Sequence, residues 1–483
     1  MKNNITVFLP LRAENETLKE LCNSPIVKEI IFLVDQKETE ISEKYKTLKI
    51  DYIFSSDTIN RMIEECQTPY FLFYTQHSDF SLGKNALERF LQIAKQTKAG
   101  ILYSDFREKN ENQSTSLHPL IDYQLGSVRD DFDFGPLLFF NKEFCLKAQE
   151  KSTNDFHFAG LYNLRLNIAS QCLPFHIDEY LYTVNNIIDK RKSGEKQFDY
   201  VDPKNRNVQL EMEKACTIYL KKIGALIEPN DNEVQFSNEF TTEASVIIPV
   251  RNREKTIADA IQSVLAQKTN FAFNLIIINN HSTDKTTEII NSFAEKDGRV
   301  IHLIPSRRDL GIGGCWQTGI EHRECGKFAV QLDSDDVYKT PETLQKIVDE
   351  FYKQKCAMLI GSYTMTNFEM EPIPPGLIDH KEWTDENGSN NALRINGLGA
   401  PRAFYTPILR EIGVPNTSYG EDYALGLQIS HSYKIGRIYE SIYLCRRWQD
   451  NTDASLSIEK VNANNHYKDK LRTIEILSRK KEN

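Results

Sequence analysis

The sequence has few of the features that mark secreted, membrane-spanning or nucleic-acid-binding proteins. Its nine cysteines are scattered over 483 residues without a Cys-x-x-Cys pair, which is typical of buried thiols in a reducing compartment rather than of a disulfide framework. No apolar run approaches the ~18–20 residues that span a bilayer. The net charge of −9 comes without a basic stripe, and this excludes general nucleic-acid binding.

The N-terminal residues lead directly into a strand-like run. Residues 1–4 are followed at once by the apolar segment 5–9, so we expect no signal peptide. We therefore expect a cytoplasmic protein without a transmembrane segment. Contact with the inner face of a membrane stays open, because the basic amphipathic stretch 467–481 either packs as a terminal helix or rests on anionic lipid.

The composition is that of a globular protein with more than one domain. Hydrophobic residues make up 40% of the chain and charged residues 26%, and the length suits two or three domains. Short apolar runs alternate with helical periods of roughly ten to fifteen residues, a pattern that predicts an α/β fold with mostly parallel sheets.

The chain looks like a duplication. Residues 5–12 and 245–252 share a strand that ends at a proline before an arginine, and the later strand 70–74 has a counterpart at 328–332. We predict one domain over residues 1–239 and another over 240–483, joined by a polar linker within 228–243. The alternative is that two unrelated α/β domains share the same rhythm.

A cluster of carboxylates gives the first indication of chemistry. Asp333, Asp335 and Asp336 follow the apolar run 327–332, and carboxylates so close together repel one another. Hard divalent cations prefer oxygen ligands, and open α/β sheets bind ligands beyond the carboxyl ends of their strands. The cluster is either a metal site for a phosphorylated ligand or a solvated acidic turn.

The second half resembles family 2 glycosyltransferases with the GT-A fold. The motifs that carry the resemblance are Ser-Val-Ile-Ile-Pro-Val-Arg-Asn (245–252), Ile-Ile-Asn-Asn-His-Ser-Thr-Asp (277–284), the glycine-containing stretch 314–320, Leu-Asp-Ser-Asp-Asp (332–336) and Gly-Glu-Asp-Tyr (420–423). The resemblance implies two GT-A-like, Rossmann-like domains in tandem. It also implies an enzyme that moves a sugar from a nucleotide-sugar donor to a hydroxyl acceptor, in the synthesis of a glycan, polysaccharide or glycoconjugate.

The resemblance assigns roles to the acidic cluster. Asp335 would bind Mn²⁺ or Mg²⁺ directly, and Asp333 would lie near both the metal and the ribose, with Ser334 between them in the donor site. The metal would neutralise the charge that grows on the diphosphate leaving group. Asp336 would shape only the turn.

The nucleotide base would bind after the first two strands of this half. Pro249, Val250 and Arg251 form the first loop, and Asn280 ends the second strand. The family usually has two aspartates here, whereas this chain has Asn279 and Asn280. Because an amide both donates and accepts hydrogen bonds, base binding survives the change, and we expect a UDP-sugar, although the exchange weakens the inference of uridine.

The acceptor hydroxyl needs a base to take its proton. By resemblance Asp422 is that base and Glu421 supports it, and a single base opposite the leaving group implies an inverting reaction. The two carboxylates could also stabilise the first turn of a helix over 423–430, and the two interpretations are compatible. The acceptor would be a glycan or a lipid-linked molecule.

An arginine pair precedes a tryptophan near the end of this half. The planar guanidinium of Arg447 suits diphosphate oxygens. Processive members of the family carry Gln-x-x-Arg-Trp, and this chain has Leu444 in place of the glutamine, so processive synthesis is not supported. Trp448 either stacks on a sugar or packs in the core.

The first half lacks these groups. Thr75 and His77 stand where the second half has Asp333 and Asp335, and no Glu-Asp pair occurs near 156–159. We therefore predict a degenerate, non-catalytic domain.

One loop of the first half keeps an alternative open. Residues 126–135 are rich in charge and aromatics, and they form either a surface loop with an aromatic anchor or a second site that uses Arg129, Asp130 and Asp131. The competing functions are a bifunctional two-site sugar polymerase and a non-enzymatic carbohydrate-binding protein.

Overall fold

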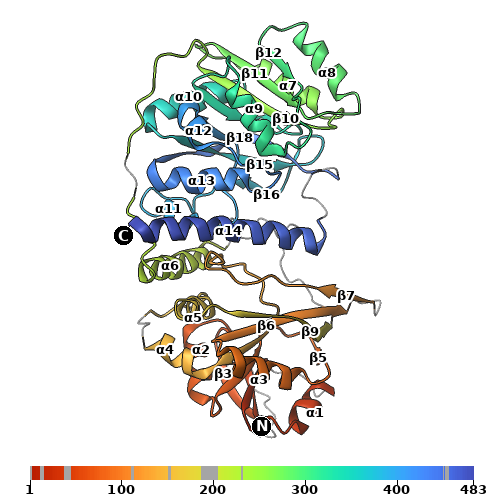
Figure 1. The fold of residues 1–483 in the computed structure, drawn as a ribbon, viewed down its shortest axis with the longest axis vertical. Coiled ribbons are helices and arrows are strands. Elements are labelled where there is room, and N and C mark those ends of the chain that lie inside the picture. The colour runs from red at the N-terminus through yellow and green to blue at the C-terminus, as the bar shows by residue number, and fades with distance from the viewer. Residues whose placement is uncertain are drawn as a thin grey trace. The chain divides into compact units, whose positions relative to one another are not determined.

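The computed structural model of the chain divides into two compact units (Figure 1). It describes residues 3–10, 16–36, 45–109, 114–150, 154–185, 205–229, 232–449, 451 and 456–482. Arg12 and part of the predicted linker, Asn230 and Asp231, lie outside the described residues. The first unit contains the described parts of Met1–Lys192, Arg206–Leu226 and Ser457–Asn483, and the second contains those of Ile227–Leu456.

The first unit is an α/β domain. Its strands are β1 (Ile5–Pro10), β2 (Val27–Asp35), β3 (Lys46–Ile50), β4 (Tyr70–Tyr74), β5 (Phe80–Leu82), β6 (Ile101–Lys109), β7 (Thr115–His118), β8 (Leu137–Asn141) and β9 (Phe175–Asn185). Its helices are α1 (Glu16–Asn23), α2 (Ser56–Glu65), α3 (Ala86–Thr97), α4 (Lys142–Gln149), α5 (Gly160–Ala169), α6 (Arg206–Lys222) and α14 (Ile458–Glu482).

The second unit repeats this succession. Its strands are β10 (Ala244–Val250), β11 (Phe273–Asn279), β12 (Val300–Leu303), β13 (Phe328–Gln331), β14 (Val337–Tyr338), β15 (Met358–Thr366), β16 (Pro372–Ile378), β17 (Arg402–Tyr405) and β18 (Ile435–Arg446). Its helices are α7 (Ile257–Leu265), α8 (Thr286–Ala294), α9 (Ile312–Glu321), α10 (Thr343–Gln354), α11 (Gly388–Asn391), α12 (Thr406–Ile412) and α13 (Glu421–Ser432).

The two sheets have the same topology. The first runs β3-β2-β1-β4-β8-β6-β9-β5 and the second β12-β11-β10-β13-β17-β15-β18-β14, each with one further strand on its sixth member. The predicted class, two α/β domains in tandem, is confirmed. The sheets are mixed rather than mostly parallel, because β8 and β17 run antiparallel to both of their neighbours.

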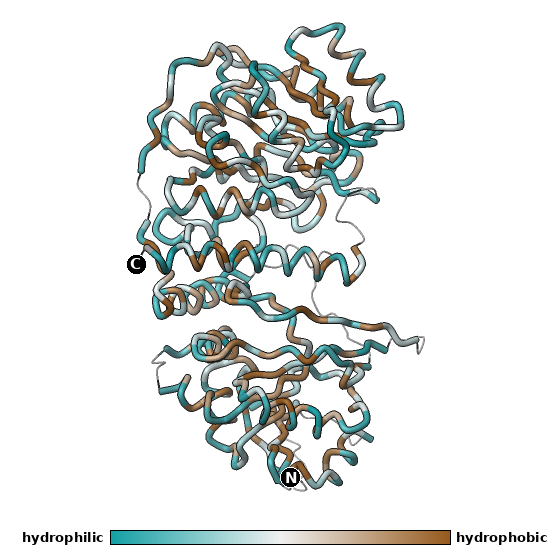
Figure 2. The backbone as a smooth tube through the Cα atoms, viewed as in Figure 1, coloured by the Kyte–Doolittle hydropathy of each residue, from teal (hydrophilic) through white to brown (hydrophobic). Residues whose placement is uncertain are grey.

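The central strands are apolar because helices cover both of their faces. Every residue of β1 and β11 is buried, as is all of β10 except Pro249. Figure 2 shows hydrophobic segments along these strands and hydrophilic residues on the outer helices. Continuous apolar runs of this kind are typical of parallel strands inside an α/β domain.

The strand register supports the internal repeat residue by residue. Ile5 pairs with Tyr70 in the first sheet, and Ala244 pairs with Phe328 in the second. If Pro10 and Pro249 are equivalent, the ladders therefore make Tyr70 equivalent to Phe328. Four residues beyond each strand start, the chain reaches Tyr74 in one unit and Leu332 in the other, directly before Thr75 and Asp333.

The last helix differs from the predicted domain division. The prediction placed residues 240–483 in one domain, but α14 belongs to the first unit. A Cβ atom on Gly126 would lie 2.2 Å from the carbonyl oxygen of Asp469 and 2.3 Å from the amide of Thr473. Only glycine permits so close an approach of the loop to the helix backbone. Helical periodicity does not encode which domain a terminal helix joins.

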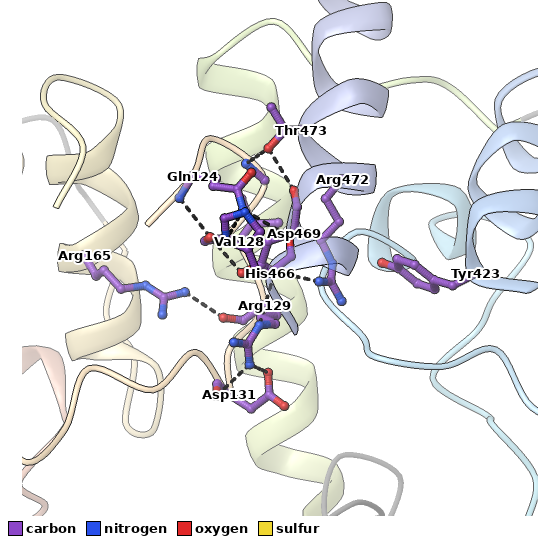
Figure 3. A network of polar contacts seen from close by, with 12 residues as sticks. Gln124, Val128, Arg129, Asp131, Arg165, Tyr423, His466, Asp469, Arg472 and Thr473 are labelled. Atoms are coloured by element: carbon purple, nitrogen blue, oxygen red, sulfur yellow. Dashed lines mark hydrogen bonds and ion pairs between the residues drawn. The ribbon is translucent and has the colours of Figure 1, made fainter. Parts of the chain in front are cut away.

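A buried polar network fastens α14 to the first unit (Figure 3). The Asp469 carboxylate is fully buried and accepts hydrogen bonds from Ser127 Oγ at 2.8 Å, Arg129 Nε at 3.2 Å and Arg472 Nη1 at 2.8 Å. Arg129 also donates to the carboxylate of Asp131 at 2.8 Å. Two buried guanidinium groups thus share the Asp469 carboxylate, and Arg129 has Asp131 as a second partner.

We predict that Asp469→Ala destabilises the first unit by about 3–5 kcal/mol, because it removes the buried carboxylate that both Arg129 and Arg472 contact. All three tryptophans (316, 383 and 448) lie in the second unit. Urea unfolding followed by circular dichroism should therefore shift to lower urea, while the tryptophan transition moves little. The exposed neighbour Lys470 provides the control, Lys470→Ala. Equal unfolding of both variants would contradict this account of the network.

Candidate active site

The acidic cluster lies directly beyond the carboxyl end of β13. The Asp333 amide donates to Tyr443 Oη on β18 at 3.1 Å, and Asp336 Oδ1 accepts from the Arg446 amide at 2.7 Å. Tyr338 Oη donates to the Gln331 carbonyl at 3.0 Å. The turn is therefore fixed by backbone contacts with its neighbours. Asp336 is buried and holds β18, in agreement with the structural role predicted for it.

A partly buried guanidinium, that of Arg402, joins the cluster to the predicted base. Gln331 Nε2 donates to Asp333 Oδ1 at 2.9 Å, and Gln331 Oε1 accepts from Arg402 Nε at 2.8 Å. Arg402 Nη1 in turn donates to Asp422 Oδ2. One hydrogen-bonded chain, Asp333–Gln331–Arg402–Asp422, thus runs from the end of β13 across β17 to the start of α13.

The two carboxylates at the start of α13 have different surroundings. Asp422 is ion-paired with Arg402, and its Oδ1 accepts from the amide of Tyr423 at 2.7 Å. Glu421 Oε2 is buried and has no hydrogen-bond partner among the described residues. Burial, followed by the negative charge of Asp422, raises the pKa of Glu421 to about 8. With a pKa of about 8, Glu421 is mostly protonated at neutral pH.

The pKa values of two aspartates at the end of β13 are raised as well. Burial raises the pKa of Asp333, an effect that Arg402 opposes and Asp335 strengthens. Burial and the charges of Asp335 and Asp333 raise the pKa of Asp336 well above its ordinary range. Such shifts indicate a site short of positive charge.

The predicted base-binding loops lie next to each other. Asn280 donates from its amide nitrogen to the Val250 carbonyl at 2.8 Å and from Nδ2 to the Leu310 carbonyl at 2.9 Å. Asn279 is fully buried, accepts from the Ser282 amide at 3.0 Å, and so acts structurally. Arg251 is exposed at the end of β10.

Helix α9 packs closely on the loop that precedes Glu421 and Asp422. A Cβ atom on Gly313 would lie 1.9 Å from the carbonyl oxygen of Pro415. Asn416 Oδ1 accepts from the Gly311 amide at 2.8 Å, and Asn416 Nδ2 donates to the Asp309 carbonyl at 3.1 Å. Because Gly311 and Gly313 have no side chain, the loop before α13 can approach the segment around Leu310, whose carbonyl Asn280 contacts.

Three donors converge on one oxygen of Asp335. Oδ2 accepts from Trp448 Nε1 and from Asn451 Nδ2, each at 3.2 Å, and lies 3.8 Å from Arg253 Nε. The indole hydrogen bond is a contact that neither sequence interpretation of Trp448, as a sugar platform or as core, had included. Arg447 donates its backbone amide to the Thr366 carbonyl at 2.8 Å, at the end of β15.

The residues present fit a divalent cation bound together with a phosphate ligand. Asp333 and Asp335 are near enough for each to influence the other's charge. Among the residues that the structure describes, no three histidine, cysteine or carboxylate side chains form a complete protein cage. Mg²⁺ characteristically takes one or two carboxylates and completes its shell with substrate phosphates, so a carboxylate pair at the strand end is the expected donor set.

The corresponding place in the first unit is apolar. By the ladder register, Phe73 stands for Gln331 and Leu138 for Arg402. Phe73 is fully buried, as are most of its neighbours in the sheet. No side chain at these two positions can continue a polar relay.

The start of α5, which corresponds to α13, is occupied by a carboxylate from another helix. Glu211 on α6 accepts from the amides of Phe158 and Ala159, at 2.6 Å and 3.1 Å. Arg129 has an exposed fraction of 2% and is committed to Asp469 and Asp131. Arg129 is therefore not available as the principal cation of a second site in the loop 126–135.

Comparison with known proteins agrees with the motifs. Residues 245–406 match the family described as Glycosyl transferase family 2. An uncharacterized glycosyltransferase of Rickettsia felis is 38% identical over 208 residues, which are 41% of this chain and 32% of that protein. Glycosyltransferase GlyA of Streptococcus pneumoniae is 28% identical over 125 residues, 26% of this chain and 17% of that protein. The second unit is a family 2 glycosyltransferase domain.

A solved structure is also similar. TarS of S. aureus in complex with UDP-GlcNAc aligns with a TM-score of 0.38 and 20% identity, over 49% of this chain and 72% of that one. The chain spans less than a third of the length of the curated relatives GlyA and the Rickettsia felis protein. None of the described helices combines the length and apolar composition of a membrane span.

The structure brings the predicted site residues to one edge of the second sheet and adds others. Asp333, Asp335, Glu421 and Asp422 come together there. The additional polar contacts come from side chains that the sequence analysis did not select, namely Gln331, Arg402, Asn416 and Asn451.

We predict that the raised pKa of Glu421 makes the second unit less stable as the pH rises. Between pH 4.5 and about 8 the folded state holds a proton that the unfolded state has released, so stability is lost by up to about 1.4 kcal/mol per pH unit. Urea unfolding with chelator, followed by tryptophan fluorescence, should show this slope in the wild type and a flatter one in Glu421→Gln. Identical pH profiles would contradict the assignment.

Proposed function

We propose that the second unit catalyses metal-dependent transfer of a sugar from a nucleotide-sugar donor to a hydroxyl acceptor, with inversion at the anomeric carbon. The observation that carries the proposal is the hydrogen-bonded chain from Asp333 through Gln331 and Arg402 to Asp422. It links a carboxylate suited to the donor's metal with a carboxylate suited to the acceptor's proton.

On the donor side, Asp335 and Asp333 would hold Mn²⁺ or Mg²⁺. The bound cation supplies positive charge to the diphosphate as the glycosidic bond breaks. Pro249, Val250, Arg251 and Asn280 would surround the nucleotide base, and a UDP-sugar is the donor we expect. Ser334, whose carbonyl accepts from Thr256 at 3.0 Å, would lie along the same turn, and Arg447 would face the diphosphate.

On the acceptor side, Asp422 would take the proton of the attacking hydroxyl. Its Oδ2 accepts from Arg402 and its Oδ1 from the amide of Tyr423, which hold the carboxylate in place. Buried Glu421 stays protonated, so it adds no second negative charge beside the base. The acceptor class is a glycan or a lipid-linked hydroxyl.

The first unit is proposed to be non-catalytic. Thr75, Phe73 and Leu138 replace an aspartate, a glutamine and an arginine of the second unit, and a neutral hydroxyl is a poor ligand for a hard cation. The bifunctional alternative requires a second set of carboxylates, and Arg129 is already committed to its own buried partners. The described part of the first unit shows no equivalent relay.

We predict that replacing Asp333 and Asp335 together by asparagine in the full chain abolishes sugar transfer, by at least about 10³-fold, without unfolding the protein. Activity is measured as nucleoside diphosphate release from a panel of sugar nucleotides with Mn²⁺ or Mg²⁺. EDTA should reproduce the loss in the wild type. Residual transfer that disappears only when Asp130 or Asp131 is also changed would make the first unit a second active site.

We predict that Asp422→Asn retains donor binding and loses turnover, with kcat reduced about 10²–10⁴-fold and KM for the donor nearly unchanged, because an amide keeps the shape but cannot accept the proton. Steady-state kinetics on the donor found by the screen separate the two parameters. Glu421→Gln is the matched control, since Gln resembles the protonated acid. A loss confined to donor affinity would show that Asp422 is not the base.

A further inference from the structure

The contacts of Asp335 are asymmetric between its two oxygens. Oδ2 accepts both side-chain hydrogen bonds, from Trp448 and Asn451, and is also the oxygen nearest Arg253. Among the described residues, no donor contacts Oδ1. A carboxylate held by one oxygen presents the other in a fixed direction, which is how outer residues commonly orient a metal ligand.

The segment that supplies these donors is itself braced. Asn451 Oδ1 accepts from the Trp448 amide at 2.6 Å, and Asn451 Nδ2 also donates to the Arg446 carbonyl at 3.1 Å. The side-chain amide of Asn451 thereby ties Trp448 to the end of β18. Both donors to Asp335 come from this one segment.

The tryptophan ring is fixed from its sides as well. The ring lies 5.3 Å from Phe368 between centroids, and the Lys255 ammonium lies 5.6 Å from the ring centre. The guanidinium of Arg446 lies 4.9 Å from the Phe368 ring. The indole N–H is therefore aimed by packing, and it points at a carboxylate rather than toward an open sugar-binding face.

We propose that Trp448 and Asn451 are positioning residues that hold Asp335 by Oδ2, so that Oδ1 is the oxygen offered to the divalent cation. The inference rests on the proposed metal-dependent function of the same site. In this proposal the Arg447–Trp448 element acts on the donor side of the site, where Trp448 positions the metal ligand Asp335.

The test is Mn²⁺ binding, measured by the loss of the free-ion EPR signal with and without UDP. Trp448→Phe keeps the ring and removes the indole donor, and Asn451→Ala removes the amide. Each should weaken Mn²⁺ binding about tenfold, the lower end of the effect of losing a metal ligand's hydrogen-bond partner. Gln449→Ala, at an exposed neighbour of Trp448 that makes neither hydrogen bond, should bind as the wild type does.

Tryptophan fluorescence gives a second measure of the binding. Bound Mn²⁺ is paramagnetic and should quench the fluorescence of Trp448 in the wild type, and Asn451→Ala, which keeps the indole, should need about tenfold more Mn²⁺ for the same quenching. If the wild type binds Mn²⁺ and both variants bind it equally well, the positioning role is overturned while the proposed function stands. If the wild type binds no Mn²⁺ under either condition, the metal-dependent function itself fails.

Discussion

The second unit holds several carboxylates together at the end of one strand, where their negative charges repel one another. Asp333, Asp335 and Asp336 share a turn, and Glu421 and Asp422 approach it from α13. Arg402 contacts Asp422 directly and reaches the cluster through Gln331. The raised pKa values of Asp333 and Glu421 show that this compensation is incomplete, which suits a site completed by a cation and a phosphate ligand.

The first unit has the same topology but no equivalent cluster of carboxylates among its described residues. Its strands pair in the same order and register, but Phe73 and Leu138 fill the positions of Gln331 and Arg402. Its buried charges lie elsewhere, around Asp469 of α14, where they join the chain's last helix to the loop at Gly126. Charge supports ligand chemistry in the second unit and packing in the first.

Local patterns in the sequence predicted a large part of this structure. Apolar runs ending in turn residues placed β1, β4, β10 and β13, and the Asp cluster follows the end of β13 as the pattern predicted. The mixed direction of the strands was not predictable in the same way, because a buried strand has the same apolar pattern whether its neighbours run parallel or antiparallel.

Contacts between residues far apart in the chain were the part that sequence reasoning missed. Arg402 and Asn451 reach the site only because β17 and the turn after β18 lie beside β13 in the folded sheet. Helix α14 joined the first unit although it follows the second in the chain, since its periodicity specifies a buried face and not the partner for that face. Trp448 was recognised, but its hydrogen bond to Asp335 depends on a side-chain direction that spacing does not encode.

The central claim is that a divalent cation binds at Asp335 in the second unit and at no equivalent place in the first. Anomalous diffraction from crystals of the full chain grown with Mn²⁺ and UDP tests it most directly. The account predicts one manganese peak in contact with an Asp335 carboxylate oxygen and none beside His77. A peak at His77, or the absence of any peak at Asp335 in crystals that show bound nucleotide, would contradict it.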